Sequence, residues 1–142
     1  MNRIKIKGST KERRDFAKKT LDWFLKKNLP RYKTLDITVD IIDCYKTSKA
    51  YGYCVALDDK HREFNIQVDK RLRLFDFITS LCHEMVHLKQ YAKFEIEDVS
   101  LNKIKWKKTI FKDTIKYDDM PWEKEAYKLE TKLAIECFKE CL

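Results

Sequence analysis

The sequence predicts an α+β fold in a single domain that spans residues 1–142. Three long segments repeat their apolar residues with the spacing of a helix, and the short segments between them alternate apolar and polar residues as strands do. The chain has only two glycines and two prolines, and 44% of its residues are hydrophobic. A chain of this length and composition buries most of its apolar surface in one core.

The first predicted helix covers residues 10–28. Its polar face carries lysines and arginines, and Ser9 or Thr10 can cap its start, while Pro30 ends it. The apolar stripe of this helix, which we expect to pack in the core, consists of Phe16, Thr20, Leu21, Phe24 and Leu25.

Three strands are expected next, at residues 35–41, 51–57 and 63–69, because large apolar residues recur at every second position in each. Asp58 and Asp59 provide a turn after the second strand. Since the connections are short and polar, the sequence predicts an antiparallel meander.

A second long helix is predicted for residues 72–92, with a nearly continuous apolar face. Apolar residues at even spacing among lysines then indicate a further strand or hairpin at residues 104–110. Pro121 begins the last helix, which runs to the C-terminus.

The second helix contains the motif His83-Glu84-Met85-Val86-His87, which reads H-E-x-x-H. The two histidines are four residues apart, so their imidazoles project from the same face of a helix and can bind one zinc ion. Glu84 is then placed beside the zinc as a general base. We interpret Cys82, which precedes the motif, as a small core residue and not as a ligand.

A catalytic zinc usually has three protein ligands. The only other histidine, His61, precedes the motif and is disfavoured, so a carboxylate of the last helix is expected instead. Glu123 lies roughly 60° from the centre of the apolar stripe of that helix and Glu125 about 90°, at ~100° per residue. We therefore favour Glu123 as the third ligand over Glu125, and we expect Glu130 to orient one of the histidines.

Other parts of the site are less sharply indicated. The oxyanion of the reaction needs a donor, for which Tyr117 and Tyr127 are candidates, although both are more typical of structural aromatic residues. Gln90 can hydrogen-bond to a ligand histidine. The strand at residues 63–69 is either an ordinary edge strand or the edge along which an extended peptide substrate lies.

The composition indicates in which compartment the protein occurs and which partners it can bind. Lysine and arginine outnumber aspartate and glutamate by 31 to 23, and the net charge of +8 favours acidic partners, which include nucleic acid. Five cysteines without a CxxC pair argue against a disulfide framework and for a cytoplasmic protein. No segment is apolar enough for a membrane span or a signal sequence.

The motif followed about 35 residues later by Glu123-Lys124-Glu125-Ala126 resembles the gluzincins, which are zinc metallopeptidases with a downstream glutamate ligand. Within them it is most similar to minimal SprT-like metallopeptidases of phages and bacteria, over residues 63 to 138. The resemblance implies a zincin-like fold, a zinc ion held by His83, His87 and Glu123, and hydrolysis of peptide bonds with Glu84 as the base. The chain departs from true SprT proteins because it lacks a downstream histidine and the cysteines of a zinc ribbon. A binding or regulatory protein with a zincin fold and a basic surface is the alternative.

Overall fold

The computed structural model describes residues 1–142 and has the α+β architecture that the sequence predicts. Its four-stranded sheet has the order β1-β2-β4-β3, and a separate three-stranded antiparallel sheet has the order β5-β6-β7. The strands are β1 (Arg3–Gly8), β2 (Asp36–Ile42), β3 (Gly52–Ala56), β4 (Glu63–Asp69), β5 (Ile96–Ser100), β6 (Lys103–Trp106) and β7 (Thr109–Lys112). The helices are α1 (Lys11–Asn28), α2 (Cys44–Ser48), α3 (Leu74–Ala92), the 3₁₀ turn η1 (Tyr117–Asp119) and α4 (Pro121–Glu140).

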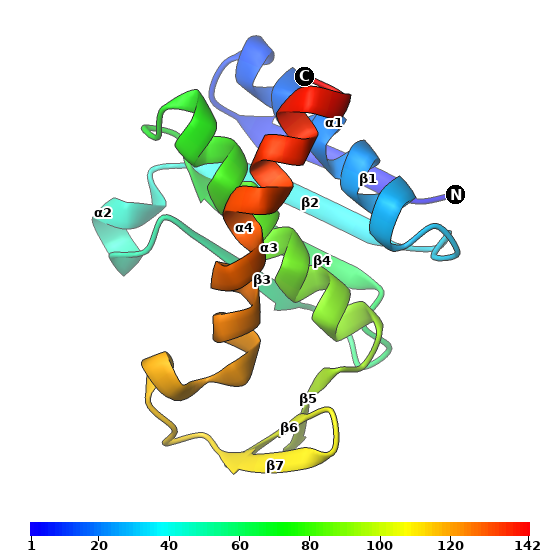
Figure 1. The fold of residues 1–142 in the computed structure, drawn as a ribbon, viewed down its shortest axis with the longest axis vertical. Coiled ribbons are helices and arrows are strands. Elements are labelled where there is room, and N and C mark those ends of the chain that lie inside the picture. The colour runs from blue at the N-terminus through cyan, green and yellow to red at the C-terminus, as the bar shows by residue number, and fades with distance from the viewer.

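The helices form layers over the main sheet (Figure 1). Helices α1 and α3 pack on the sheet, and α4 crosses α3 on the side away from it. Apolar residues of β2 and β4 alternate with polar ones, so one face of each strand enters the core beneath α3. The fully buried side chains of that core include Ile37, Val39, Phe64, Ile66, Phe77, Ile78, Leu81 and Met85.

The predicted helices are confirmed with small shifts of their ends. Thr10 caps α1, since its hydroxyl accepts a hydrogen bond from the Arg13 N–H at 3.1 Å. Helix α3 begins at Leu74, two residues after the predicted start, and α4 begins at Pro121 as expected. Cys82 is completely buried in the core cluster, which confirms its interpretation as a small core residue.

The predicted antiparallel meander is wrong. Strand β4 pairs in parallel with β2 and antiparallel with β3, so β3 is at the edge of the sheet and β4 lies inside it. The segment around α2 carries the chain past the position of β4 before β3 begins, so that β4 returns between β2 and β3. The parallel edge strand β1 was not predicted at all. The expected hairpin at residues 104–110 is present, with β5 as an additional partner.

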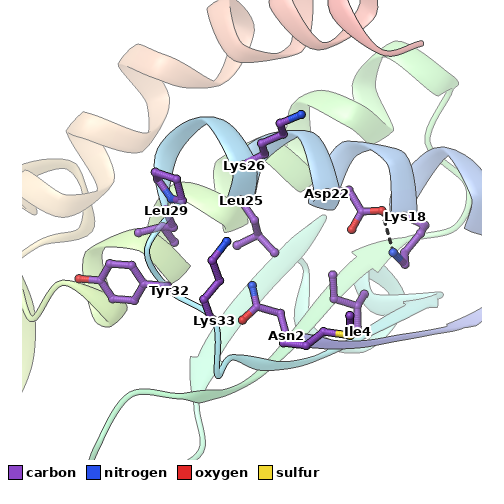
Figure 2. A pocket seen from close by; sticks show the side chains of 11 residues that line it. Asn2, Ile4, Lys18, Asp22, Leu25, Lys26, Leu29, Tyr32 and Lys33 are labelled. Carbon is purple, nitrogen blue, oxygen red and sulfur yellow. Dashed lines mark hydrogen bonds and ion pairs between the residues drawn. The ribbon is translucent and has the colours of Figure 1, made fainter.

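A hollow of about 490 Å³ lies between α1 and the start of β1 (Figure 2). Its apolar wall includes Leu25 and Leu29, and Lys26 and Lys33 stand at its rim. None of the four helices is both long enough and apolar enough to cross a lipid bilayer. The cytoplasmic location expected from the cysteines stays a prediction.

Candidate metal centre

Helices α3 and α4 bring two histidines and one glutamate together. His83 and His87 are one turn apart on α3, and Glu123 lies in the first turn of α4. The Glu123 Oε1 atom is 3.0 Å from His83 Nε2 and 3.1 Å from His87 Nε2. One ligand atom from each residue lies within 4.8 Å of the other two, so the three residues could hold a metal ion. These are the three residues that the sequence predicts as ligands.

The Nδ1 atom of each histidine is hydrogen-bonded to a further side chain. His83 Nδ1 is 2.8 Å from the Glu130 carboxylate, and His87 Nδ1 is 2.8 Å from Gln90 Oε1. Because a carboxylate or an amide oxygen only accepts, each Nδ1 carries the hydrogen, and the lone pair of the neutral ring is on Nε2. Each Nε2 faces Glu123 and donates to it while the imidazole is protonated, and a neutral ring would present its Nε2 lone pair to a metal at this position, as in proteins that bind metals through histidine. The predicted roles of Glu130 and Gln90 in orienting the histidines agree with this geometry.

Glu125 does not enter the cluster. Gln90 Nε2 donates hydrogen bonds to the Trp122 carbonyl at 3.0 Å and to Glu125 Oε1 at 3.2 Å. These donations fix the orientation of the Gln90 amide and tie α3 to the start of α4. Glu125 thus supports the residue that orients His87, while Glu123, two positions earlier, faces both histidines.

His61 also lies outside the cluster, as the sequence favours. Its Nδ1 is 2.7 Å from the Tyr91 carbonyl oxygen, and its ring stacks on Phe94 with the centroids 4.3 Å apart. Tyr91 and Phe94 belong to the C-terminal end of α3 and the segment that follows it, beyond the turn that carries His87. His61 therefore lies at a separate position on the molecule.

Without a metal, hydrogen bonds and burial set the charges of the cluster. Burial opposes the charged form of His83, but hydrogen bonds to Glu123 and Glu130 outweigh it and raise the pKa of His83 to about 9. For Glu123, burial acts to raise the pKa, yet hydrogen bonds to His83 and His87 outweigh it and lower the pKa to about 2. An anionic oxygen between two imidazoles gives the electrostatics of a cation site.

Glu84 is beside the cluster but is not part of it. Only 5% of Glu84 is exposed, and it lines a cavity of about 660 Å³ together with His83. Burial raises the pKa of Glu84 to about 7, against the opposing effect of His87 and His83, and no hydrogen bond contributes. A largely buried carboxyl with a raised pKa at a cavity wall is typical of functional sites.

Two tyrosines stand on the open side of the cluster. The Tyr117 hydroxyl donates a hydrogen bond to Glu123 Oε1 at 3.1 Å, and it lies 3.0 Å from the Tyr127 hydroxyl. The Tyr127 ring meets the His83 ring edge-on, with the centroids 4.6 Å apart. Both side chains are about half exposed and both line the cavity, so their hydroxyls are available to a bound molecule.

The edge strand beside the cavity is β3 and not the predicted strand at residues 63–69. A methyl group added to Gly52, at the start of β3, would be 3.1 Å from Glu84 Oε2 and 3.0 Å from the Gln67 carbonyl oxygen. Gly52 therefore lets β3 approach the Glu84 carboxylate closely. Our sequence analysis missed this residue, although it is one of only two glycines in the chain and interrupts a strand pattern.

We compared the chain with models of protein families, with curated proteins and with solved structures, and no match was found.

Proposed function

We propose that the protein is a zinc metallopeptidase of the gluzincin type, with a zincin-like fold. The observation that carries this proposal is the buried Glu84 carboxylate, which has no hydrogen-bond partner and faces the cavity beside His83, His87 and Glu123. A purely structural metal site has no need for such a carboxylate. A catalytic site needs one as a base.

The donor set supports zinc as the metal. Two imidazole nitrogens and one carboxylate oxygen form the ligand set of many catalytic zinc sites, in which one position remains free. Zinc bound there would polarise the carbonyl group of a peptide and lower the pKa of water to about 7. His83, His87 and Glu123 would hold the ion, and Glu130 and Gln90 would keep the two imidazoles in the tautomer that binds it.

Glu84 would move the protons of the reaction. Its carboxylate would accept a proton from the attacking water and deliver it to the amine that leaves. A base works best when its pKa is near the pH of the reaction, and burial raises the pKa of Glu84 to about 7 in the metal-free protein. Gly52 keeps β3 close enough to hold the carboxylate against the cavity.

A peptide substrate would lie along β3. This strand has one edge free of partners in the sheet, and its start abuts Glu84. An extended peptide adds to such an edge through backbone hydrogen bonds. We therefore assign the binding of the substrate to β3 and not to the strand at residues 63–69. The hydroxyls of Tyr117 and Tyr127, which line the same cavity, would be side-chain donors for the oxyanion.

The test is hydrolysis of a denatured protein or a peptide mixture by the zinc-loaded protein, beside the Glu84→Gln variant. We expect cleavage by the wild type and a loss of roughly a hundredfold or more in the variant, with the zinc content unchanged. Glu12→Gln is the matched control, because it makes the same chemical change at an exposed residue of α1 outside the cavity and should keep most of the activity. Cleavage that survives Glu84→Gln, or none by the zinc-loaded wild type, contradicts the proposal.

The distribution of charge favours a second candidate function, binding of nucleic acid. Residues 1–33 contain 12 lysines and arginines against three acidic residues, whereas residues 34–142 contain 19 against 20. Lys26 and Lys33 stand at the rim of the hollow in Figure 2 without an ion pair. This candidate predicts DNA binding that weakens steeply with salt and is lost in a Lys26→Glu, Lys33→Glu variant. If the variant binds DNA as the wild type does, this hollow has no such role.

A further inference from the structure

A second hollow lies at the opposite end of β3 from Gly52. Its volume is about 370 Å³, and its walls come from the end of β3, from the end of α3 and from β5. Ala56 and Leu57 provide the β3 wall, and Tyr91 and Phe94 provide the wall at the end of α3. A peptide that pairs with the free edge of β3 would therefore pass Glu84 at one end of the strand and reach this hollow at the other.

The ionised side chains of this hollow are all acidic. Asp58, Asp59, Glu97 and Asp98 line it, and no lysine or arginine does, although the chain as a whole has a net charge of +8. Asp59 and Asp98 form no ion pair, and the only ion pair of Glu97 is a long one of 4.0 Å to Lys105. We refer to this hollow as the acidic hollow.

Asp58 is fixed in its charged form. Its Oδ1 atom accepts hydrogen bonds from the backbone N–H groups of Arg62 and Glu63, at 2.8 and 2.9 Å. The bond from Glu63 is the main reason why the pKa of Asp58 is lower than usual. Its second oxygen takes part in no hydrogen bond within the protein and is left as an acceptor.

His61 gives an independent indication of what the acidic hollow binds. The residue is only 9% exposed and lines the hollow. Its Nδ1 donates to the Tyr91 carbonyl oxygen, so Nε2 of the neutral ring is an acceptor, and Nε2 has no partner in the protein. This nearly buried acceptor and the four carboxylates can accept hydrogen bonds from a donor that enters the hollow.

A metal ion is not the ligand that these groups fit. Three or more of them would have to converge on one point, yet the ligand atoms that lie within 4.8 Å of one another belong to His83, His87 and Glu123. The acceptors of the acidic hollow are spread over a larger space. An ammonium or guanidinium group at the end of a flexible side chain matches such a spread of acceptors.

We infer that the acidic hollow receives a lysine or arginine side chain of the peptide substrate on β3, so that the substrates are basic polypeptides. This inference rests on the proposed peptidase function and names its substrate class. Strand β3 rises roughly 13 Å from Gly52 to Ala56 at ~3.3 Å per residue, which places the basic residue about three or four positions from the cleaved bond.

The positive net charge of the protein does not oppose this inference. Charges more than about 8–10 Å apart are largely screened at physiological ionic strength. The excess of positive charge lies in residues 1–33, and none of these residues lines the acidic hollow. The four carboxylates and His61 line the hollow and therefore determine its preference.

The test is the binding of short labelled peptides to the zinc-loaded Glu84→Gln variant, one of alternating lysine and alanine and one of alternating glutamate and alanine. We expect the lysine peptide to bind roughly tenfold more tightly or better, and the added pair Asp59→Lys, Asp98→Lys to abolish this preference. Asp15→Lys, Asp113→Lys is the control, because it changes the net charge equally outside the hollow. The milder pair Asp59→Asn, Asp98→Asn serves if the lysine variant does not fold.

Equal binding of the two peptides, or an equal effect of the control pair, would overturn the inference. The cleavage assay separates this failure from a failure of the proposed function. Cleavage that depends on Glu84 but shows no preference for a nearby lysine or arginine overturns the inference alone. A lysine preference in binding, with no cleavage by the wild type, overturns the peptidase function and leaves the acidic hollow as a site for basic peptides.

Discussion

Replacing Gly52 by alanine tests whether β3 holds Glu84 in its working position. The new methyl carbon would be 3.1 Å from Glu84 Oε2 and 3.3 Å from Glu84 Cγ, where ordinary contacts begin at 3.4 Å. The carboxylate must therefore move by about 0.3 Å. Since a displacement of 1 Å costs on the order of a hundredfold in rate, we expect kcat to fall by roughly fourfold, and by more if the Gln67 carbonyl also forces β3 outwards.

The assay is kcat for a peptide that the wild type cleaves, with the zinc content and Tm measured on the same samples. Both should be nearly unchanged, because the atoms nearest to the new methyl group belong to Glu84 and Gln67 and not to the three metal ligands. Glu84→Asp provides the control, since the shorter side chain withdraws from β3, and Gly52→Ala should then change kcat by less than about twofold. A folded, zinc-loaded Gly52→Ala protein with the wild-type kcat would refute the reasoning.

Three further predictions concern the metal ligands and the fold. Glu130→Ala removes the group that orients His83 through a 2.8 Å hydrogen bond, so zinc affinity in a chelator competition should fall about 10–100-fold. The metal-free protein should lose roughly 5 °C or more in Tm between pH 6.5 and 9, because the pKa of His83 is raised from 6.5 to about 9 on folding. A raised pKa stabilises the fold below the ordinary value of the group and loses that effect as the pH rises through the folded value. Gly8→Ala should lower Tm by roughly 5–10 °C, since Gly8 has φ +92° and a methyl group would overlap the Ile41 carbonyl oxygen.

Each of these predictions has a result that would contradict it. Unchanged zinc affinity in Glu130→Ala would mean that the His83 imidazole is held without this carboxylate. A metal-free Tm that is flat or rises from pH 6.5 to 9 would contradict the pKa directions, and zinc-loaded protein should show a weaker pH dependence because the metal replaces the protons. A Gly8→Ala protein as stable as the wild type would mean that β1 can move away from β2 at little cost.

The candidate metal centre could be predicted because helices translate sequence spacing directly into geometry. The four-residue spacing of His83 and His87 determines their common face once α3 is a helix. Pro121 determines where α4 begins, and the buried face of α4 then separates Glu123 from Glu125. Both inferences use one helix at a time and need no knowledge of the rest of the fold.

The arrangement of the sheet could not be predicted in the same way. Alternation of apolar and polar residues tells which face of a strand is buried, but it gives neither the direction of the strand nor its neighbours. Strand β4 was therefore predicted as an edge strand, although it lies between β2 and β3. Strand β1 has only two apolar residues, Ile4 and Ile6, to mark it. The acidic hollow depends on the order of the strands, so it could not be predicted from the sequence.

The metal content of the purified protein tests the central claim most directly. We would measure zinc by elemental analysis in the wild type and in His83→Ala, Glu123→Ala and Glu125→Ala. The geometry predicts one zinc ion per chain, lost with His83 and with Glu123 and retained with Glu125. A wild-type protein that binds no zinc when it is supplied, or zinc that survives Glu123→Ala and is lost with Glu125→Ala, would contradict the account.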